Sequence, residues 1–469
     1  MNGYADLLKA DNGQPAQNIH IVDAASYEGW LATQPERVRT ALAAQRYRPK
    51  AYAHAILPGD KAEEWAVLTT VANAEKLSSW CLARLAEILP AGSYRLAGDG
   101  DVGPAGLGWM TAQYRFDRYR NEPVDDGTGP RTLLTHDVAH IEQTIRLAAA
   151  VHLVRDLVNT PTADMGPPDL ERSAEEIAQR HHAAFTVTRG DALEQGYPMI
   201  HAVGRAAHRD YAPRLIEMTW GQPDHPRVTL IGKGVCFDSG GLDIKPSSAM
   251  RLMKKDMGGA AHALALAELV MAEALPVRLH LLIPAVENAI SGNAFRPGDV
   301  LASRRGISVE IGNTDAEGRL VLGDALTRAA EEKPDLIIDF ATLTGAARVA
   351  LGPDLPALFA NDDDLARQLV DLGRQVDDPL WQLPLWPGYG EMLKSDIADI
   401  ANAGEGGFAG AITAALFLQK FVEDGTMWAH FDTFAWRPTA RPGRPKGGEA
   451  LGLRAAFALL QLRYPRAQK

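Results

Sequence analysis

Cysteine is scarce in this sequence, with only Cys81 and Cys236 among 469 residues. Two cysteines cannot build a disulfide framework, and such a low count is typical of proteins from a reducing compartment. The sequence also lacks a run of about 18 apolar residues that could span a membrane. Its start, MNGYADLLKADNGQ, has neither the basic nor the apolar region of a signal peptide. We therefore expect a cytoplasmic protein with no membrane partner.

Basic residues are outnumbered, because 48 lysines and arginines face 59 aspartates and glutamates, for a net charge of −11. A protein whose main partner is nucleic acid needs a basic surface to bind phosphates, so this balance argues against that class. The segment RPTARPGRPKGG at 437–448 is basic, but isolated charge runs of this kind are usually solvated.

The length of the chain predicts two domains. In the first part, 51–58 and 65–71 are typical of strands, and the apolar spacing of 73–89 predicts a helix. The polar stretch NEPVDDGTGP at 121–130 has the composition of a linker, and 136–159 predicts one long helix. We therefore predict an N-terminal α/β domain over 1–130 and a larger domain over 131–469, entered by this helix.

Apolar, strand-like stretches alternate with helix-like stretches in the rest of the chain. Strands are expected at 227–237, 278–287, 335–343 and 427–434, and helices at about 256–274, 320–332 and 410–423. This alternation predicts an α/β fold with a mostly parallel central sheet flanked by helices. Such sheets bind ligands beyond the carboxyl ends of their strands, so polar residues directly after a strand are candidates for a site.

The stretch GNTDAEGRL at 312–320 places three charged residues after an apolar run. Asp315, Glu317 and Arg319 occupy every second position, and in an extended segment such residues share one face. A solvated strand face would show the same pattern. The interpretation therefore depends on which other segments reach the same place.

Two other segments carry charged residues at equivalent places. Lys233, Asp238 and Lys245 lie in GKGVCFDSGGLDIK, which begins in the last part of a predicted strand and continues beyond it, and Asp256 opens the next predicted helix. If these ends converge, four carboxylates would lie together and raise each other's pKa. Two divalent cations would balance them, and carboxylates with one nitrogen donor suit Zn²⁺ or Mn²⁺. Acids shared between two metals would hold them about 3.5–4 Å apart.

Each of these residues also has a simpler interpretation. Lys233 can bind a metal only as a neutral amine, so a dication would have to lower its pKa from about 10.4. Alone, a lysine between two glycines is more typical of a solvated or anion-binding turn. Asp256 could be a charge at a helix N-terminus, and the segment 238–241 could be an ordinary turn. Composition and periodicity leave these alternatives open.

Several motifs resemble those of the leucyl aminopeptidase family, also called the cytosol aminopeptidase family or metallopeptidase family M17. NTDAEGRL (313–320) resembles the family signature, and the block at 232–261 is similar to its other metal-binding block, with a similar gap between them. Shorter similarities occur at 341–352, 395–418 and 428–432, and the resemblance is thin before about residue 150. It implies an N-terminal macro-like α/β domain and a catalytic peptidase domain.

The resemblance implies five ligands for two divalent metal ions, Zn²⁺, Mn²⁺ or both. Asp238, Asp315 and Glu317 would hold the more exchangeable metal, with Asp315 also using its backbone carbonyl. Lys233, Asp238, Asp256 and Glu317 would hold the tighter one. Asp238 and Glu317 would therefore bridge the two ions.

The resemblance also implies a reaction, in which a metal-bridging water removes the N-terminal residue, leucine by preference, from a peptide. Lys245 and Arg319 occupy the two catalytic positions: the lysine would stabilise the oxyanion, and the arginine would hold a bicarbonate ion that moves the proton. The implied partners are peptides and further copies of the chain in a homohexamer. The implied substrate-binding residues are Lys245, Asp256, Thr342, Leu343, Thr344 and Gly345.

Two other classes of function stay open at this point: a DNA-binding or regulatory member of the family, and a dinuclear hydrolase of phosphate esters. His430 and Asp432 in WAHFD have the look of a catalytic pair. No nucleophile is adjacent in the sequence, so we expect them to have a structural role on a core strand.

Overall fold

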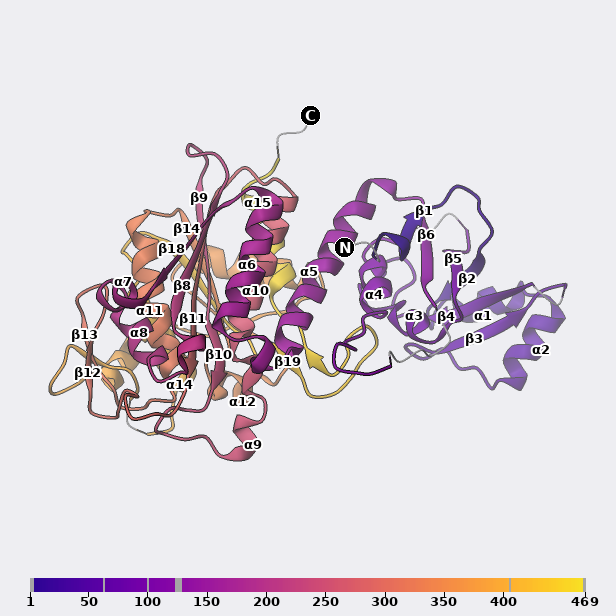
Figure 1. Ribbon diagram of the computed structural model, residues 1–469. Helices are drawn as coiled ribbons and strands as arrows, with labels where there is room; N and C mark the ends of the chain where they lie inside the picture. Colours follow the sequence, from indigo (N-terminus) through magenta and orange to yellow (C-terminus); the bar gives the residue numbers. More distant parts are fainter. Residues whose placement is uncertain (1–3, 62–63, 99–100, 123–128, 405, 467–469) are drawn as a thin grey trace. The chain divides into compact units, whose positions relative to one another are not determined.

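The computed structural model describes residues 4–61, 64–98, 101–122, 129–404 and 406–466. The chain divides into two compact units, Met1–His152 with Thr439–Lys446 and Leu153–Pro438 with Gly447–Lys469 (Figure 1). The long helix predicted at 136–159 is present as α5 (Ile141–Asn159), which contributes residues to both units. Most of the predicted linker, 123–128, lies outside the described residues.

The smaller unit contains a six-stranded sheet in the order β1-β6-β5-β2-β4-β3, in which only β3 is antiparallel to its neighbour. Its strands are β1 (Leu8–Ala10), β2 (Gln17–Val22), β3 (His54–Pro58), β4 (Trp65–Thr70), β5 (Gly92–Leu96) and β6 (Arg131–Thr135). Its helices are η1 (Tyr4–Asp6), α1 (Tyr27–Ala32), α2 (Glu36–Ala44), α3 (Ala83–Ile88), α4 (Ala105–Thr111) and η2 (Val138–His140).

The helix predicted over 73–89 is wrong for its first part, since only α3 forms there. The side-chain oxygen of Asn73 accepts hydrogen bonds from the backbone N–H groups of Glu75 and Lys76, at 2.8 and 3.1 Å. These two bonds close a turn, and the chain does not continue it as a helix until α3.

The larger unit contains a nine-stranded, mostly parallel sheet, as predicted. Its order is β16-β15-β18-β14-β9-β11-β8-β7, and β10 also pairs with β11. The strands are β7 (Ala184–Arg189), β8 (Arg214–Trp220), β9 (Arg227–Gly232), β10 (Gly234–Asp238), β11 (Arg278–Asn288), β14 (Leu336–Ala341), β15 (Ala357–Ala360), β16 (Trp381–Gln382) and β18 (Met427–Asp432). Two small sheets contain β12 (Val300–Ala302), β13 (Ser308–Glu310) and β17 (Ile400–Ala401), and β19 (Trp436–Arg437) and β20 (Gly447–Gly448).

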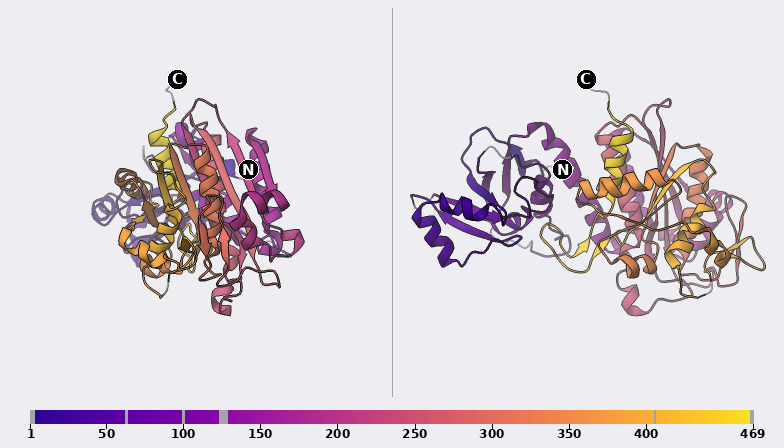
Figure 2. Two further views of the ribbon diagram at one scale, coloured as in Figure 1. Left: turned by 90° about the vertical axis from the view of Figure 1, so that its left-hand side faces the viewer. Right: turned by 180° about the vertical axis from the view of Figure 1, so that it is seen from behind.

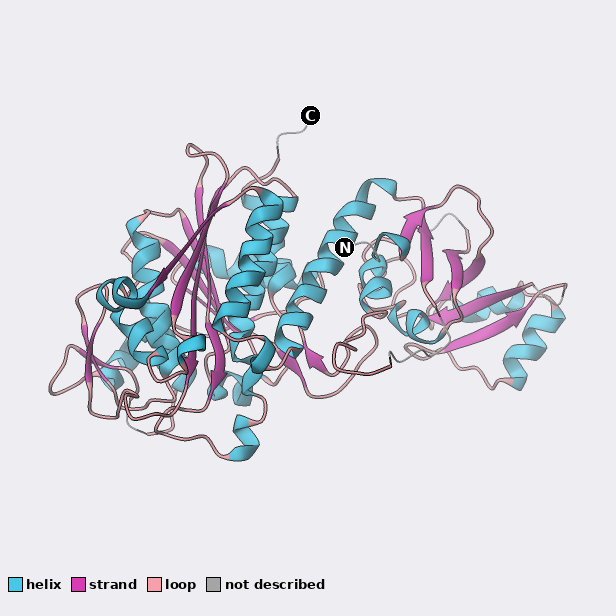
Figure 3. Ribbon diagram, in the orientation of Figure 1, coloured by secondary structure: helices cyan, strands magenta, loops and turns pink. Residues whose placement is uncertain are grey.

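Helices cover both faces of this sheet (Figures 1 to 3). One layer contains α6 (Pro167–His181), α10 (Gly258–Ala272), α13 (Asp363–Gln375) and α15 (Leu453–Arg463), and the other contains α8 (Pro198–Gly204), α11 (Glu317–Glu331) and α14 (Gly410–Gln419). Short helices are η3 (Thr162–Asp164), α7 (Gly190–Gly196), η4 (Arg209–Tyr211), α9 (Ser247–Met250), η5 (Met253–Met257), α12 (Gly345–Leu351) and η6 (Pro387–Leu393). Within the described part of the chain, no helix has the length and apolar character needed to cross a membrane.

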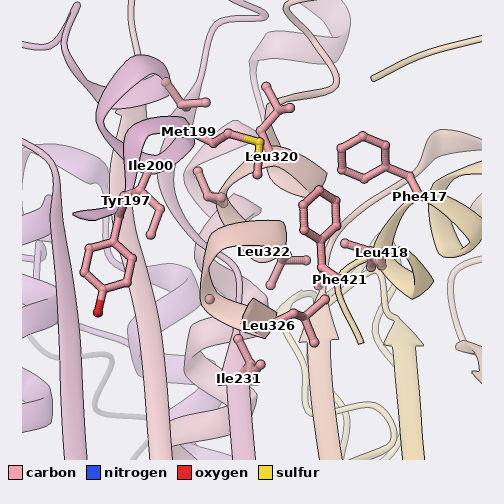
Figure 4. Close-up of a cluster of buried hydrophobic side chains, with 14 of the residues drawn as sticks. Tyr197, Met199, Ile200, Ile231, Leu320, Leu322, Leu326, Phe417, Leu418 and Phe421 are labelled. Carbon is pink, nitrogen blue, oxygen red and sulfur yellow. The ribbon is translucent and has the colours of Figure 1, made fainter. Parts of the chain in front are cut away.

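An apolar cluster between the sheet and the second helix layer fixes the position of α11 (Figure 4). Burying each large apolar side chain of this kind stabilises the fold by about 1.5–3 kcal/mol. Because α11 begins at Glu317, this packing also holds the signature segment in place. The cluster includes Met199, Ile200, Ile231, Leu320, Leu322, Leu326, Phe417, Leu418 and Phe421.

Candidate metal centre

The sequence predicts one strand over 227–237, but the structure divides it at Lys233. β9 ends at Gly232 and β10 begins at Gly234. The backbone N–H of Lys233 donates to the Phe340 carbonyl at 2.9 Å, and its carbonyl accepts from Ala260 N–H at 2.9 Å. Lys233 thus stands where two strands and the start of α10 meet.

The Lys233 side chain connects two of the predicted metal ligands. Its Nζ lies 2.7 Å from Oδ2 of Asp256 and 2.8 Å from Oε1 of Glu317. Only 2% of Lys233 is exposed, so the interpretation as a solvated turn is wrong. Asp256 belongs to η5, directly before α10, and Glu317 is the first residue of α11.

The Lys245 side chain connects the other two acids. Its Nζ lies 2.8 Å from Oδ2 of Asp238 and is in direct contact with the Asp315 carboxylate. One carboxylate oxygen from each of Asp238, Asp315 and Glu317 lies within 4.8 Å of the other two. The structure therefore brings four carboxylates and two lysines into one place.

The prediction that Asp315, Glu317 and Arg319 share a face of an extended segment is wrong. The helix already begins at Glu317, and two positions along an α-helix differ by about 200° in direction. Nη1 of Arg319 donates to the backbone carbonyl of Asn402 at 2.6 Å. Its Nε is buried and, among the described residues, has no hydrogen-bond partner.

Burial and mutual repulsion favour protonation of the acids at the centre of the cluster. Burial raises the pKa of Glu317 to about 7, and Asp238 adds to the shift. Burial and then Asp256 raise the pKa of Asp238 to about 6. Burial, followed by Glu317, also raises the pKa of Asp315. These shifts are expected of like charges held together in a dry site.

The pKa of Asp256 shifts the other way. Burial acts to raise it, but Lys233 and then Lys255 outweigh burial and hold this pKa below its usual range. Burial acts to lower the pKa of Lys233, but Asp256 and Glu317 raise it well above its ordinary value. When only these acids surround it, Lys233 is therefore an ammonium. A bound dication would favour the neutral amine, which is the form that binds metal.

The donor set fits a divalent metal. Three carboxylate oxygens, on Asp256, Asp315 and Glu317, are buried and accept no directed hydrogen bond within the described structure, although each lies close to a lysine ammonium. Leaving buried carboxylate oxygens without such bonds costs free energy. Metal coordination would satisfy them, because carboxylate oxygens and an amine are ligands that Zn²⁺ and Mn²⁺ accept.

Sequence reasoning missed two asparagines that hold the cluster. Nδ2 of Asn288, the last residue of β11, donates to Oδ1 of Asp238 at 2.9 Å and to the Thr314 carbonyl at 3.1 Å. Asn402 accepts from Gly312 N–H at 2.8 Å and donates to the Asn313 carbonyl at 2.7 Å. Asn288 could have been found from the sequence, because it lies at the end of a predicted strand. Nothing in the sequence around Asn402 indicates its role.

A cavity of about 610 Å³ opens over the cluster. All six predicted substrate-binding residues line it, together with the five predicted metal ligands. Residues that the sequence analysis did not single out also line it, namely Leu252, Met253, Lys255, Arg348 and Phe434.

Asp432 holds the backbone of one cavity wall. Its Oδ1 accepts from the N–H groups of Leu343 and Thr344 at 3.0 and 3.2 Å, and its Oδ2 accepts from the Thr344 hydroxyl at 2.6 Å. His430 lies away from the cavity, buried against Asp339. Both residues of the pair in WAHFD lie on a core strand, as expected, and Asp432 also shapes the cavity.

Buried carboxylates and lysines near the carboxyl ends of a mostly parallel sheet, next to a cavity, are the arrangement expected of a metal-dependent hydrolase. Residues 152–457 match the cytosol aminopeptidase family, catalytic domain, and 18–127 match the M17 aminopeptidase, N-terminal domain. The chain belongs to the cytosol aminopeptidase family, and it is a metal-dependent aminopeptidase, a hydrolase that acts on peptides.

Individual relatives support this assignment. A probable cytosol aminopeptidase of Syntrophotalea carbinolica is 42% identical over 371 residues, covering 76% of this chain and 73% of the relative. The crystal structure of the cytosol aminopeptidase from Coxiella burnetii has a TM-score of 0.92 at 46% identity and covers 97% of this chain and 99% of that one. The bottromycin maturation enzyme BotP in complex with Mn has a TM-score of 0.83 at 30% identity, covering 98% and 100%.

Proposed function

We propose that this aminopeptidase uses two divalent metal ions, held by Lys233, Asp238, Asp256, Asp315 and Glu317, to remove the N-terminal residue from peptides. The observation that carries the proposal is the position of Lys233, whose Nζ lies within 2.8 Å of both Asp256 and Glu317. A buried amine between two buried carboxylates is what we expect of residues that bind two metal ions together. Asp238 and Glu317 would contribute to the binding of both ions.

The metals, when bound, would polarise the scissile carbonyl and activate a water molecule. Lys245 would donate to the oxygen that becomes negatively charged. Burial acts to lower the pKa of Lys245, but Asp238 and then Glu317 raise it above its ordinary value, so the side chain stays cationic at neutral pH. A cation held in a water-poor site stabilises a developing oxyanion strongly.

Arg319 would hold a bicarbonate ion that accepts and returns the proton. Two features support this role: Arg319 is buried, with 8% of the residue exposed, and its Nε has no hydrogen-bond partner in the described structure. Because Nη1 is already bonded to the Asn402 carbonyl, the remaining N–H groups are the ones that could bind the anion.

The wall formed by Thr342, Leu343, Thr344 and Gly345 would bind the peptide backbone, together with Lys245 and Asp256, which line the same cavity. Thr342 Oγ1 donates to Oδ1 of Asp256 at 2.7 Å, which couples this wall to the metal cluster. A wall fixed at both ends orients the scissile bond at little further entropic cost.

The family resemblance also supports a homohexamer in the cytoplasm and Zn²⁺ or Mn²⁺ as the metals. Manganese gains support from the BotP complex with Mn. The exposed side chains of Phe408 and Val349, 85% and 84% accessible, are of the kind that subunit contacts cover.

The test uses metal-stripped enzyme reconstituted with Zn²⁺ or Mn²⁺. We expect about two ions per chain by elemental analysis and release of p-nitroaniline from leucyl-p-nitroanilide. p-Nitrophenyl phosphate serves as the substrate of the rival phosphoesterase. Phosphate-ester hydrolysis without amide hydrolysis would overturn the proposal, and a gel shift at low and high salt tests the DNA-binding alternative.

A further inference from the structure

Two basic side chains that line the cavity, Lys255 and Arg348, are not among the proposed metal ligands. Four basic residues line the cavity, and Lys233 and Lys245 are in close contact with the acids. The other two, Lys255 and Arg348, make no hydrogen bond with an acid within the described chain. They face the substrate space in a protein whose net charge is −11.

Lys255 is buried, and its ammonium has no hydrogen-bond partner among the residues that the structure describes. Its side chain is 6% exposed, and among the described acids only Asp256 approaches it, with Oδ1 at 3.8 Å. This separation is too long for a hydrogen bond. Asp256 is moreover already engaged by Lys233 at 2.7 Å and by the Thr342 hydroxyl at 2.7 Å. Burying an ammonium without a partner is costly, so this group fits a ligand that enters the cavity.

The Phe434 ring contacts both Lys255 and Arg348. The Lys255 Nζ lies 5.2 Å and the Arg348 Cζ 4.9 Å from the centre of the same Phe434 ring. Contact with an aromatic ring holds each cation in place without neutralising it. Because Lys255, Arg348 and Phe434 line the same cavity, an anionic group that enters next to this ring would be attracted by both cations.

The position of Lys255 identifies the part of the substrate that meets it. Its ammonium lies 3.8 Å from the carboxylate of Asp256, a proposed metal ligand. In the proposed function the N-terminal residue is the substrate residue bound against the metals, so its side chain is the one within reach.

We propose that Lys255 and Arg348 bind the side-chain carboxylate of an N-terminal glutamate or aspartate, so that the enzyme favours acidic N-terminal residues over their uncharged amide analogues. This inference rests on the proposed aminopeptidase function. Without Lys255 and Arg348, the acidic metal ligands would repel such a side chain. With these two residues present, the carboxylate forms a charge-assisted pair that the amide of glutamine cannot make.

The test compares leucyl-, glutaminyl- and α-glutamyl-p-nitroanilide with the metal-reconstituted full-length enzyme. Glutamine has nearly the shape of glutamate, so the ratio of the two kcat/KM values isolates the charge. We expect glutamate to be favoured roughly tenfold. Lys255→Met and Arg348→Met should each lower this ratio several-fold, and the ratio is unaffected by a general loss of turnover. Lys420→Met, which removes an exposed lysine that does not line the cavity, should leave the ratio and leucine turnover unchanged.

Binding supplies a second measurement, in case Lys255→Met folds poorly. Free glutamate should inhibit leucyl-p-nitroanilide hydrolysis more strongly than free glutamine does, and Arg348→Met, on the exposed side of α12, should reduce that difference. Hydrolysis of the leucyl substrate with glutamate no better than glutamine would overturn this inference and leave the aminopeptidase function intact. A glutamate preference unchanged in both variants would overturn it too. Hydrolysis of none of the three amides would overturn the proposed function and this inference with it.

Discussion

Gly318 and Lys233 are packed so closely that no side chain fits between them: a Cβ on Gly318 would lie 2.5 Å from Cε and 2.7 Å from Nζ of Lys233. Lys233 cannot simply swing away, because its Nζ is held by Asp256 and Glu317. The absence of a side chain at Gly318 therefore leaves the space that the Lys233 side chain occupies.

Gly318→Ala should displace Lys233 and weaken metal binding by roughly 10- to 100-fold, as expected when the orientation of a ligand is disturbed. The fold should persist, since alanine is favourable in a helix. Metal retained after dialysis, measured by elemental analysis, and far-UV circular dichroism check the two expectations. Gly390→Ala is the matched control, because a Cβ there meets nothing within 4 Å. Equal metal retention in both variants would show that the contact does not matter.

Asp256→Ala should lower the metal content and abolish turnover. It removes one proposed ligand and leaves Lys233 with Glu317 as its remaining close acid. Loss of a direct ligand with no substitute nearby is expected to affect the tighter metal most. The measurement is metal stoichiometry together with leucyl-p-nitroanilide hydrolysis. Unchanged stoichiometry would contradict the ligand assignment.

Lys245→Ala should retain both metals and lose mainly kcat, by roughly 10²- to 10³-fold. The lysine contacts Asp238 and Asp315 but would act on the charge that develops during the reaction. Steady-state kinetics give kcat and KM separately, and elemental analysis supplies the control. An intact kcat would assign Lys245 to structure instead.

Much of the fold could be predicted from the sequence, because apolar strands and amphipathic helices carry periods of their own. The helices α10, α11 and α14 and the strands β11, β14 and β18 lie where the pattern places them, within a few residues. The proposed ligands were found because charged residues follow strands, and parallel strands end at one edge.

Other features depend on contacts between distant segments, which periodicity does not encode. The break at Lys233 arises because Phe340 and Ala260 take its backbone hydrogen bonds. The direction of Arg319 depends on where α11 begins and on Asn402, which is 83 residues further along the chain. Lys255 and Phe434 meet only in the folded structure, so their pairing had no signal in the sequence.

The pH dependence of metal binding is the last expectation. Glu317, with its pKa raised by burial to about 7, is protonated below that pH, and Asp238, raised by burial to about 6, follows as the pH falls further. A metal must displace these protons, so its affinity should fall as the pH decreases from 8 to 5.5. Lys233, whose pKa lies above its ordinary value because Asp256 and Glu317 outweigh burial, should release a proton at every pH in this range. Calorimetry in two buffers of different ionisation enthalpy counts the protons: at least one at pH 8 and more at pH 5.5. An affinity independent of pH, with no proton release, would be incompatible with an amine and buried acids as the ligands.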